Sequence, residues 1–355
     1  MDIKITKTTT PRTKPSGDNI PFGTFFSDHM FLMNYVQGQG WIDPRIVPYG
    51  TIALEPSAMV LHYAQEVFEG MKAYRTAEGK IQLFRPTENI ARMARSCEKL
   101  CIPEVPEDIY LQAIKTLVEL DKDWVPSAPD TSLYIRPFVF ATDPHVGVHA
   151  SHTYIFCIIT CPVGSYYPEG LDPVHIAIES REVRAVRGGT GFTKCGGNYA
   201  ASLHAGEQAA AQGFSQVLWL DGVEQKYIEE VGSMNVMFKI AGKIITPSLA
   251  NGSVLPGITR KSAIQVLRDW GYDVQERDLS VDELIEAANN GALEEAWGTG
   301  TAAVVSPIGE IFYQDKKYTI NNFEIGEVTQ KLYDTITGIQ WGKIDDPYNW
   351  AVPVC

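Results

Sequence analysis

One lysine, Lys194, lies in a glycine-rich run whose composition suits covalent chemistry on a bulky ligand. The run reads Arg-Gly-Gly-Thr-Gly-Phe-Thr-Lys-Cys-Gly-Gly-Asn-Tyr over residues 187–199. Glycine lets the backbone come close to a planar group. A lysine that its surroundings make nucleophilic forms a Schiff base with an aldehyde. The aldehyde cofactor that this chemistry suggests is pyridoxal phosphate.

Lys194 also has less specific interpretations. The run fails as a nucleotide P-loop, because that loop needs Gly-Lys-Ser/Thr and here Thr193 precedes the lysine and Cys195 follows it. A solvated lysine on a mobile loop remains an alternative. The cofactor hypothesis therefore requires a phosphate site, an acidic partner for the pyridine nitrogen and a substrate pocket elsewhere in the chain.

Two further segments are candidates for these parts. Glu229 and Glu230 end a strand-like run before a small-residue turn, and a buried carboxylate keeps a pyridine nitrogen protonated. The segment 255–260, Leu-Pro-Gly-Ile-Thr-Arg, opens an amphipathic helix whose N-terminal N–H groups suit a phosphate. A glycine-rich turn at 298–302 offers more N–H groups to an anion. A solvated turn and an ordinary helix start are the alternatives.

Composition limits the class of protein. The 355 residues suggest about two domains, and 45% hydrophobic with 21% charged residues is typical of a globular protein. A net charge of -13 argues against nucleic acid as a partner. The six cysteines are scattered in apolar runs, which favours a reducing compartment. With no secretory signal and no apolar run of ~18 residues, we expect a cytoplasmic protein with no membrane partner.

The expected elements mix helices and strands. In the first half, short strands are expected over 20–86, helices over 87–102 and 107–122, and strands over 132–142 and 152–163. In the second half the pattern predicts a helix over 199–212, a strand over 216–220 and a hairpin over 227–247. Three further helices are expected: one after residue 257, one that begins at the capping box 280–283, and one over 324–339. The strict alternation of a doubly wound sheet and a GxGxxG motif are absent, which disfavours a nicotinamide enzyme.

A turn-rich stretch, 162–173, is the best candidate boundary between domains. We expect a small N-terminal domain over 1–163 with a flexible extension at 1–19. An interdomain linker over 164–180 and a large cofactor-binding domain over 181–355 would follow.

Two groups of side chains suggest other sites. His145, His149 and His152 have a spacing that could bind a metal, but no acidic or cysteine ligand completes the set, so no metal is expected. Lys72 is a second candidate lysine, and it lacks the glycine framing of Lys194.

Several short runs, in order, carry a family resemblance. From about Phe22 to Trp341 the chain resembles the branched-chain aminotransferases of the class IV (fold type IV) pyridoxal phosphate enzymes. The matching runs are Phe22-Gly23 with Ser27-Asp28-His29-Met30, Phe68-Glu69-Gly70-Met71-Lys72-Ala73, Leu83-Phe84-Arg85-Pro86, Leu133-Tyr134-Ile135-Arg136-Pro137, Lys194-Cys195-Gly196-Gly197-Asn198-Tyr199, Gln216-Val217-Leu218-Trp219-Leu220, Glu230-Val231-Gly232-Ser233-Met234-Asn235 and Leu255-Pro256-Gly257.

The resemblance implies a fold and an activity. The fold would be α/β (α+β), with a small N-terminal α/β domain, a larger C-terminal domain with a barrel-like β core, and the cofactor at the domain interface. The activity would be reversible ping-pong transfer of the amino group of L-leucine, L-isoleucine or L-valine to 2-oxoglutarate, giving the 2-oxo acid and L-glutamate. Alternatives are a D-amino acid aminotransferase, an aminodeoxychorismate lyase, or a non-catalytic protein that binds the cofactor.

The resemblance also implies residue roles. Lys194 would form the Schiff base and move the proton, Tyr199 would bond the cofactor's phenolic oxygen, and Glu230 would hold the pyridine nitrogen. The phosphate and the rest of the cofactor would be bound by Arg92, Ile258, Thr259, Thr301 and Ser233. The substrate would contact Phe22, Tyr63, Tyr134, Tyr166, Arg136, Thr301 and Ala302. Val148 would reach the pocket of a neighbouring subunit, which implies a homodimer.

Overall fold

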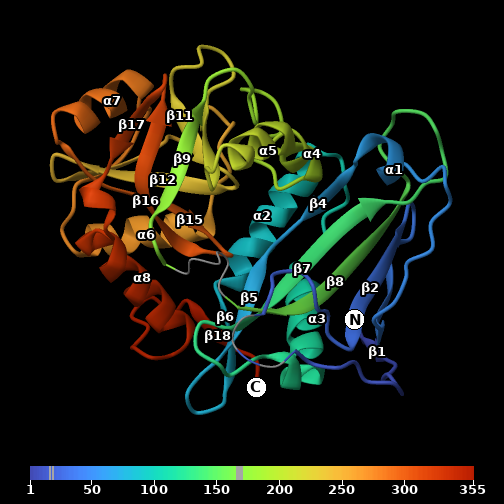
Figure 1. Cartoon of the computed structure of the whole chain (residues 1–355). Helices are drawn as coiled ribbons and strands as arrows, with labels where there is room; N and C mark the ends of the chain where they lie inside the picture. The colour runs from blue at the N-terminus through green and yellow to red at the C-terminus, as the bar shows by residue number, and fades with distance from the viewer. Residues whose placement is uncertain (16, 18–19, 165–170) are drawn as a thin grey trace. The chain divides into compact units, whose positions relative to one another are not determined.

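The chain forms two compact units in a computed structural model, which describes all 355 residues except 16, 18–19 and 165–170 (Figure 1). The first unit comprises Met1–Tyr166, Thr193–Gly196 and Gly338–Cys355, and the second comprises Tyr167–Phe192 and Gly197–Thr337. This differs from the expected division in two respects. The segment with Lys194 and the C-terminal residues belong to the first unit, and the expected linker contains a strand, β9 (Val174–Glu179), of the second unit's sheet.

A nine-stranded sheet organises the first unit. Its order is β1-β3-β2-β8-β7-β5-β6-β18, and β4 pairs with β7. Apart from the parallel pair β1–β3, neighbouring strands are antiparallel. The strands are β1 (Lys4–Ile5), β2 (His29–Val36), β3 (Gly40–Pro48), β4 (Glu66–Phe68), β5 (Met71–Arg75), β6 (Ile81–Phe84), β7 (Ser132–Ala141), β8 (Thr153–Val163) and β18 (Ala351–Pro353).

The N-terminal residues are more ordered than the sequence suggests. Strand β1 pairs with Arg45–Ile46 of β3. The Thr8 amide donates to His29 Nε2 at 2.9 Å, and the Arg12 amide donates to Asp28 Oδ1. Pairing with β3 and two backbone-to-side-chain hydrogen bonds therefore hold parts of the segment that was expected to be a flexible extension.

Two helices, α2 (Pro86–Lys99) and α3 (Glu107–Leu120), pack on one face of this sheet (Figure 1). Leu133, Ile135 and Val139 of β7 lie in the apolar core that these helices share with the sheet. Because side chains alternate along a strand, Tyr134 and Arg136 point to the opposite face. The short helices α1 (Val60–Tyr63) and η1 (Lys122–Trp124) lie in the connections.

A six-stranded barrel-like sheet forms the core of the second unit. The path β11-β10-β9-β16-β15-β12 closes through an additional pairing between β11 and β12, while β13, β14 and β17 extend it. This confirms the expected barrel-like β core. The other strands are β10 (Gln216–Leu220), β11 (Ile228–Val231), β12 (Met234–Ile240), β13 (Lys243–Thr246), β14 (Val274–Glu276), β15 (Leu293–Gly300), β16 (Val304–Tyr313) and β17 (Lys316–Thr319).

The helix expected over 199–212 is two helices, α4 (Gly196–Ala200) and α5 (Leu203–Ala211). At the break, Ser202 Oγ donates to the Tyr199 carbonyl at 2.7 Å, so a side chain satisfies a carbonyl that a continuous helix would bond through its backbone. The remaining helices are α6 (Ile258–Asp269), α7 (Val281–Asn289), η2 (Asn321–Phe323) and α8 (Glu327–Gln340). Ser280 caps α7 as the capping box predicts, accepting from the Glu283 amide at 3.1 Å.

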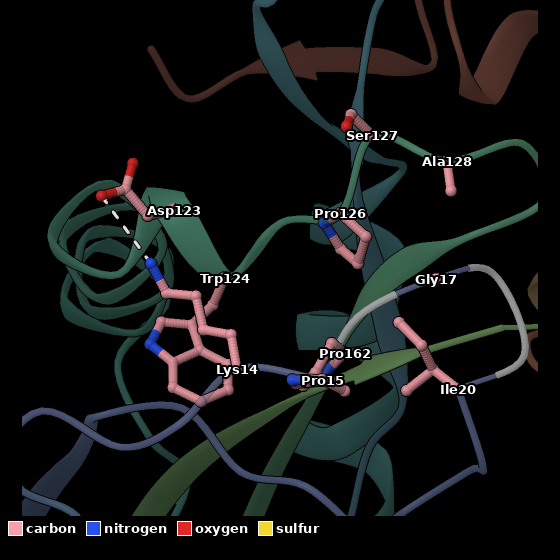
Figure 2. Close-up of a pocket in the computed structure, with 10 residues that line it drawn as sticks. All are labelled: Lys14, Pro15, Gly17, Ile20, Asp123, Trp124, Pro126, Ser127, Ala128 and Pro162. Atoms are coloured by element: carbon pink, nitrogen blue, oxygen red, sulfur yellow. Dashed lines mark ion pairs between the residues drawn. The ribbon is translucent and has the colours of Figure 1, made fainter.

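A cavity of about 240 Å³ in the first unit lies apart from the predicted chemistry (Figure 2). Lys14, Asp123 and Trp124 line this cavity. Lys14 Nζ lies 3.9 Å from Asp123 Oδ2 and 5.9 Å from the centre of the Trp124 ring. None of the predicted site residues lines it. Among the described residues, no helix is both long and apolar enough to cross a bilayer.

Candidate active site

The segment that carries Lys194 is bonded to β4 and α2 of the first unit. The Phe68 amide donates to the Lys194 carbonyl at 2.9 Å, and the Lys194 amide donates to Ser96 Oγ at 3.0 Å. The Gly196 amide donates to Glu66 Oε1. These bonds fix the backbone on both sides of the lysine side chain, which a mobile surface loop would not require.

The Lys194 amine has an unusual environment for a lysine. Its Nζ lies 4.8 Å from the centre of the Phe68 ring. Burial, with a smaller contribution from the Arg92 cation, lowers the pKa of Lys194 to about 8, and Glu69 opposes the change. A pKa near 8 in place of 10.5 raises the neutral, nucleophilic fraction at pH 7 by roughly two orders of magnitude. The side chain is therefore suited to attack an aldehyde.

A buried carboxylate that the sequence did not single out, Glu69, pairs with Arg92. Arg92 Nε and Nη2 donate to the two carboxylate oxygens of Glu69 at 2.7 and 2.8 Å. Asn89 Nδ2 adds a bond of 2.8 Å. Burial alone would raise the pKa of Glu69, but Arg92, Lys194 and Asn89 together outweigh it and hold the pKa below its ordinary value. Glu69 lies between β4 and β5, and no local pattern in the sequence pairs it with Arg92.

Tyr134 and Arg136 meet on the face of the sheet away from α2 and α3. Arg136 Nη2 donates to the Tyr134 hydroxyl at 3.0 Å, and its guanidinium lies 4.6 Å from the Phe68 ring centre. Phe22 packs edge-on against Tyr134 with ring centres 4.9 Å apart. The Cβ of any side chain at Gly70 would collide with the Tyr134 hydroxyl, so this approach requires glycine. The rings of Phe22 and Tyr134 thus form an apolar surface beside the Arg136 cation.

Lys72 lies on this same face, directly opposite Tyr134 in the register of β5 and β7. Burial lowers the pKa of Lys72 to about 8. The pKa values therefore do not separate Lys72 from Lys194. The position of the cofactor attachment is what distinguishes the two lysines.

Glu230 is buried in the second unit and pairs with Arg184. Glu230 Oε2 lies 3.0 Å from Arg184 Nε, and Oε1 accepts from the Leu255 amide at 2.7 Å. Arg184 Nη2 also donates to the Ser253 carbonyl at 2.6 Å. Sequence reasoning missed Arg184, because nothing near it in the sequence pairs it with an acid. The arrangement places a carboxylate beside a guanidinium in a buried position.

The start of α6 is connected to Glu230 through Asn235. Asn235 Nδ2 donates to the Leu255 carbonyl at 2.9 Å and to Glu230 Oε1 at 3.4 Å. A Cβ at Gly257 would collide with Asn235 Oδ1, so glycine permits this packing. No described side chain caps α6, and its first turn carries no acid. The N–H groups of this turn fit an anion such as phosphate.

The other predicted residues lie on several further elements. Tyr199 is half-buried on α4, Ser233 is exposed between β11 and β12, and Thr301 and Ala302 are half-buried between β15 and β16. Tyr63 ends α1, and Val148 is 85% exposed between β7 and β8. Tyr166 lies outside the described residues. The structure thus brings together Lys194, Arg92, Tyr134, Arg136 and Phe22 in one unit, and Glu230, Ile258 and Thr259 in the other.

Glu229, the neighbour of Glu230, should make stability depend on pH. Burial raises its pKa to about 7, and its Oε2 has no hydrogen-bond partner among the described residues. Between pH 4.5 and 7 the folded chain then binds more protons than the unfolded chain, so the unfolding free energy falls as pH rises. In Glu229→Gln the decrease in unfolding free energy between these pH values should be smaller by about 1–3 kcal/mol. Urea denaturation of both proteins across this range measures it, and parallel curves would contradict the assignment.

Comparison with known proteins places these features in a family. A family model described as amino-transferase class IV matches residues 66–311. The chain therefore belongs to the class IV aminotransferases. It is 56% identical to branched-chain-amino-acid aminotransferase 2 of Bacillus subtilis over 99% of this chain and 97% of that protein. It is 52% identical to branched-chain-amino-acid transaminase 1 of the same organism over 99% of both chains. The chain is thus an aminotransferase of the branched-chain group.

A solved structure shows the same fold. The branched-chain aminotransferase of the thermophilic archaeon Thermoproteus uzoniensis, solved with norvaline, has a TM-score of 0.76 and 25% identity to this chain. The match covers 92% of this chain and 100% of that one. This confirms fold type IV for the present chain.

Proposed function

We propose that the chain transfers the amino group of L-leucine, L-isoleucine or L-valine reversibly to 2-oxoglutarate by a ping-pong mechanism. The names of the full-length relatives support the substrate class. The observation that carries the chemistry is the Lys194 amine, whose pKa is lowered to about 8 beside Arg92, Glu69, Tyr134 and Arg136.

We propose pyridoxal phosphate as the cofactor, which supplies an electron sink for the carbon that loses its proton. Lys194 would hold it covalently through Nζ, and Glu230 would keep the ring nitrogen protonated. Arg92 and the N–H groups of Ile258 and Thr259 would bind the phosphate, while Tyr199, Ser233 and Thr301 would contact the remainder. The uncapped start of α6 and the buried Glu230 carboxylate fit these roles.

The protein's own part in the reaction is proton transfer and orientation. Lys194 Nζ would take the proton from the substrate α-carbon and deliver it to the bound cofactor, and it would move a proton in the opposite direction during the second half-reaction. Glu230, which Arg184 keeps paired, would remain ionised throughout. The residues of the first unit would position the substrate.

The substrate pocket must accept both an apolar side chain and the distal carboxylate of glutamate. Phe22 and Tyr134 offer an apolar surface, and Arg136 lies beside them. Tyr63, Tyr166 and the turn with Ala302 complete the proposed pocket. A pocket of this kind distinguishes single methylenes only weakly, so all three branched substrates should react.

Replacing Arg136 by methionine should separate the two kinds of substrate. Arg136→Met should raise KM for 2-oxoglutarate by roughly tenfold to a hundredfold, since a carboxylate loses its cationic partner. The half-reaction with L-leucine should change only a few-fold. Stopped-flow measurement of each half-reaction tests this, and equal losses in both would assign Arg136 a structural role instead.

The first experiment is a spectrum of the purified protein titrated with L-leucine and then with 2-oxoglutarate. Absorbance near ~410–420 nm should fall with leucine and return with 2-oxoglutarate. An absorbance change with D-alanine alone would indicate a D-specific enzyme. A bound chromophore whose absorbance changes with neither amino acid would indicate a binding protein without turnover.

We also propose a cytoplasmic homodimer in which Val148 of a second copy reaches the substrate pocket. The exposure of this valine, at 85%, supports a contact with another chain. The six free cysteines favour a reducing compartment. Light scattering of the purified protein measures the assembly.

A further inference from the structure

The loop between β7 and β8 gathers three potential metal ligands that the aminotransferase chemistry does not use. Asp143, His149 and His152 each offer a ligand atom, and these atoms lie within 4.8 Å of one another. The histidine spacing alone lacked an acid to complete it. The structure supplies that acid, because Asp143 begins the loop whose other end carries the two histidines.

The distances among these atoms fit a metal ion. His149 Nε2 lies 3.5 Å and His152 Nδ1 lies 3.1 Å from Asp143 Oδ2. Ligand atoms placed tetrahedrally around zinc at about 2.0–2.2 Å lie roughly 3.3–3.5 Å apart. The two distances to Asp143 are therefore close to the edges of a zinc tetrahedron, while the three ligand atoms together span up to 4.8 Å, so a small side-chain rotation would complete the set.

The tautomer of His149 points to the same conclusion. His149 Nδ1 lies 2.9 Å from the Gly147 carbonyl, which can only accept, so Nδ1 carries a hydrogen. Nε2 is then the ring nitrogen that faces the Asp143 carboxylate, 3.5 Å from Oδ2. A backbone carbonyl on the remote nitrogen is also how proteins orient metal-binding histidines.

The position of the carboxylate is fixed by the loop. Thr153 Oγ1 donates to Asp143 Oδ1 at 2.9 Å, the His152 amide donates to Oδ2 at 2.8 Å, and the Met59 amide donates to the Asp143 carbonyl at 3.0 Å. Asp143 is buried, His149 is half-buried and His152 is exposed. A preformed ligand set thus opens to solvent on one side, where an ion can enter.

We propose that Asp143, His149 and His152 form a three-ligand site for a borderline divalent cation, with zinc as the preferred ion. Two imidazoles and one carboxylate are ligands that zinc accepts, and water would fill the fourth position. The site would tie the two ends of the β7–β8 loop together. This inference does not rest on the aminotransferase chemistry, although the site lies in the same loop as Val148.

The test uses the full-length protein without a histidine tag, loaded with its cofactor and freed of metal with a chelator. Equilibrium dialysis against zinc chloride should show one zinc bound per chain. His149→Gln and His152→Gln should each weaken that binding at least about tenfold. Cobalt in place of zinc should give the visible absorption of a tetrahedral site in the wild type alone.

His204→Gln is the matched control, since His204 is also paired with a single carboxylate, Glu182, but has no second histidine. It should leave zinc binding unchanged. Circular dichroism checks that each variant is folded. The proposal is wrong if the His149→Gln/His152→Gln double variant binds as much zinc per chain as the wild type. It is also wrong if the wild type binds no zinc.

Discussion

Lys194→Ala should remove covalent cofactor binding and lower the transamination rate by at least about four orders of magnitude. The lysine is proposed both to bond the cofactor and to move the proton, and general acid–base catalysis alone contributes about 10²–10⁴-fold. Borohydride reduction followed by peptide mass analysis of the wild type should show the cofactor attached at Lys194. The steady-state rate with L-leucine and 2-oxoglutarate gives the size of the loss.

Lys72→Ala is the control for this experiment, because Lys72 is also a buried lysine with its pKa lowered to about 8. The reduced cofactor should still be found on Lys194 in this variant. Attachment at Lys72 in the wild type, or a normal rate in Lys194→Ala, would refute the assignment. The peptide map separates the two lysines even where both variants lose activity.

Glu230→Gln should slow the half-reaction with L-leucine by roughly 10²–10³-fold, the range seen when one preorganised electrostatic partner of a transition state is removed. A neutral amide cannot keep the ring nitrogen protonated as a carboxylate does. Glu229→Gln is a matched control in the same strand and should stay within a few-fold of the wild-type rate. Stopped-flow absorbance of cofactor-loaded protein measures both.

Glu230→Gln also leaves the buried Arg184 cation without its acid, which should lower the unfolding free energy by about 3–5 kcal/mol. The double variant Glu230→Gln/Arg184→Met removes both charges and should regain much of that stability without regaining the rate. Urea denaturation and the half-reaction rate are therefore read together. If stability and rate recover together, Glu230 acts on the fold and not on the cofactor.

Local patterns in the sequence were sufficient for most elements and for the class of chemistry. The capping box at Ser280 begins α7 as predicted, and the alternation over 132–142 corresponds to β7. These features depend on a few neighbouring residues, so the sequence displays them directly. The glycine run around Lys194 likewise pointed to one lysine among many, and the order of the motifs pointed to the family that the comparisons confirm.

Tertiary structure decided which distant groups meet. Glu69 pairs with Arg92 and Glu230 pairs with Arg184 through sheet and helix packing, and no spacing along the chain reveals such pairs. The same holds for the pKa of Lys194, because burial and neighbouring charges exist only after folding. The sequence alone determined the residue types and the local backbone preferences, whereas the fold determined their partners and therefore their charge states.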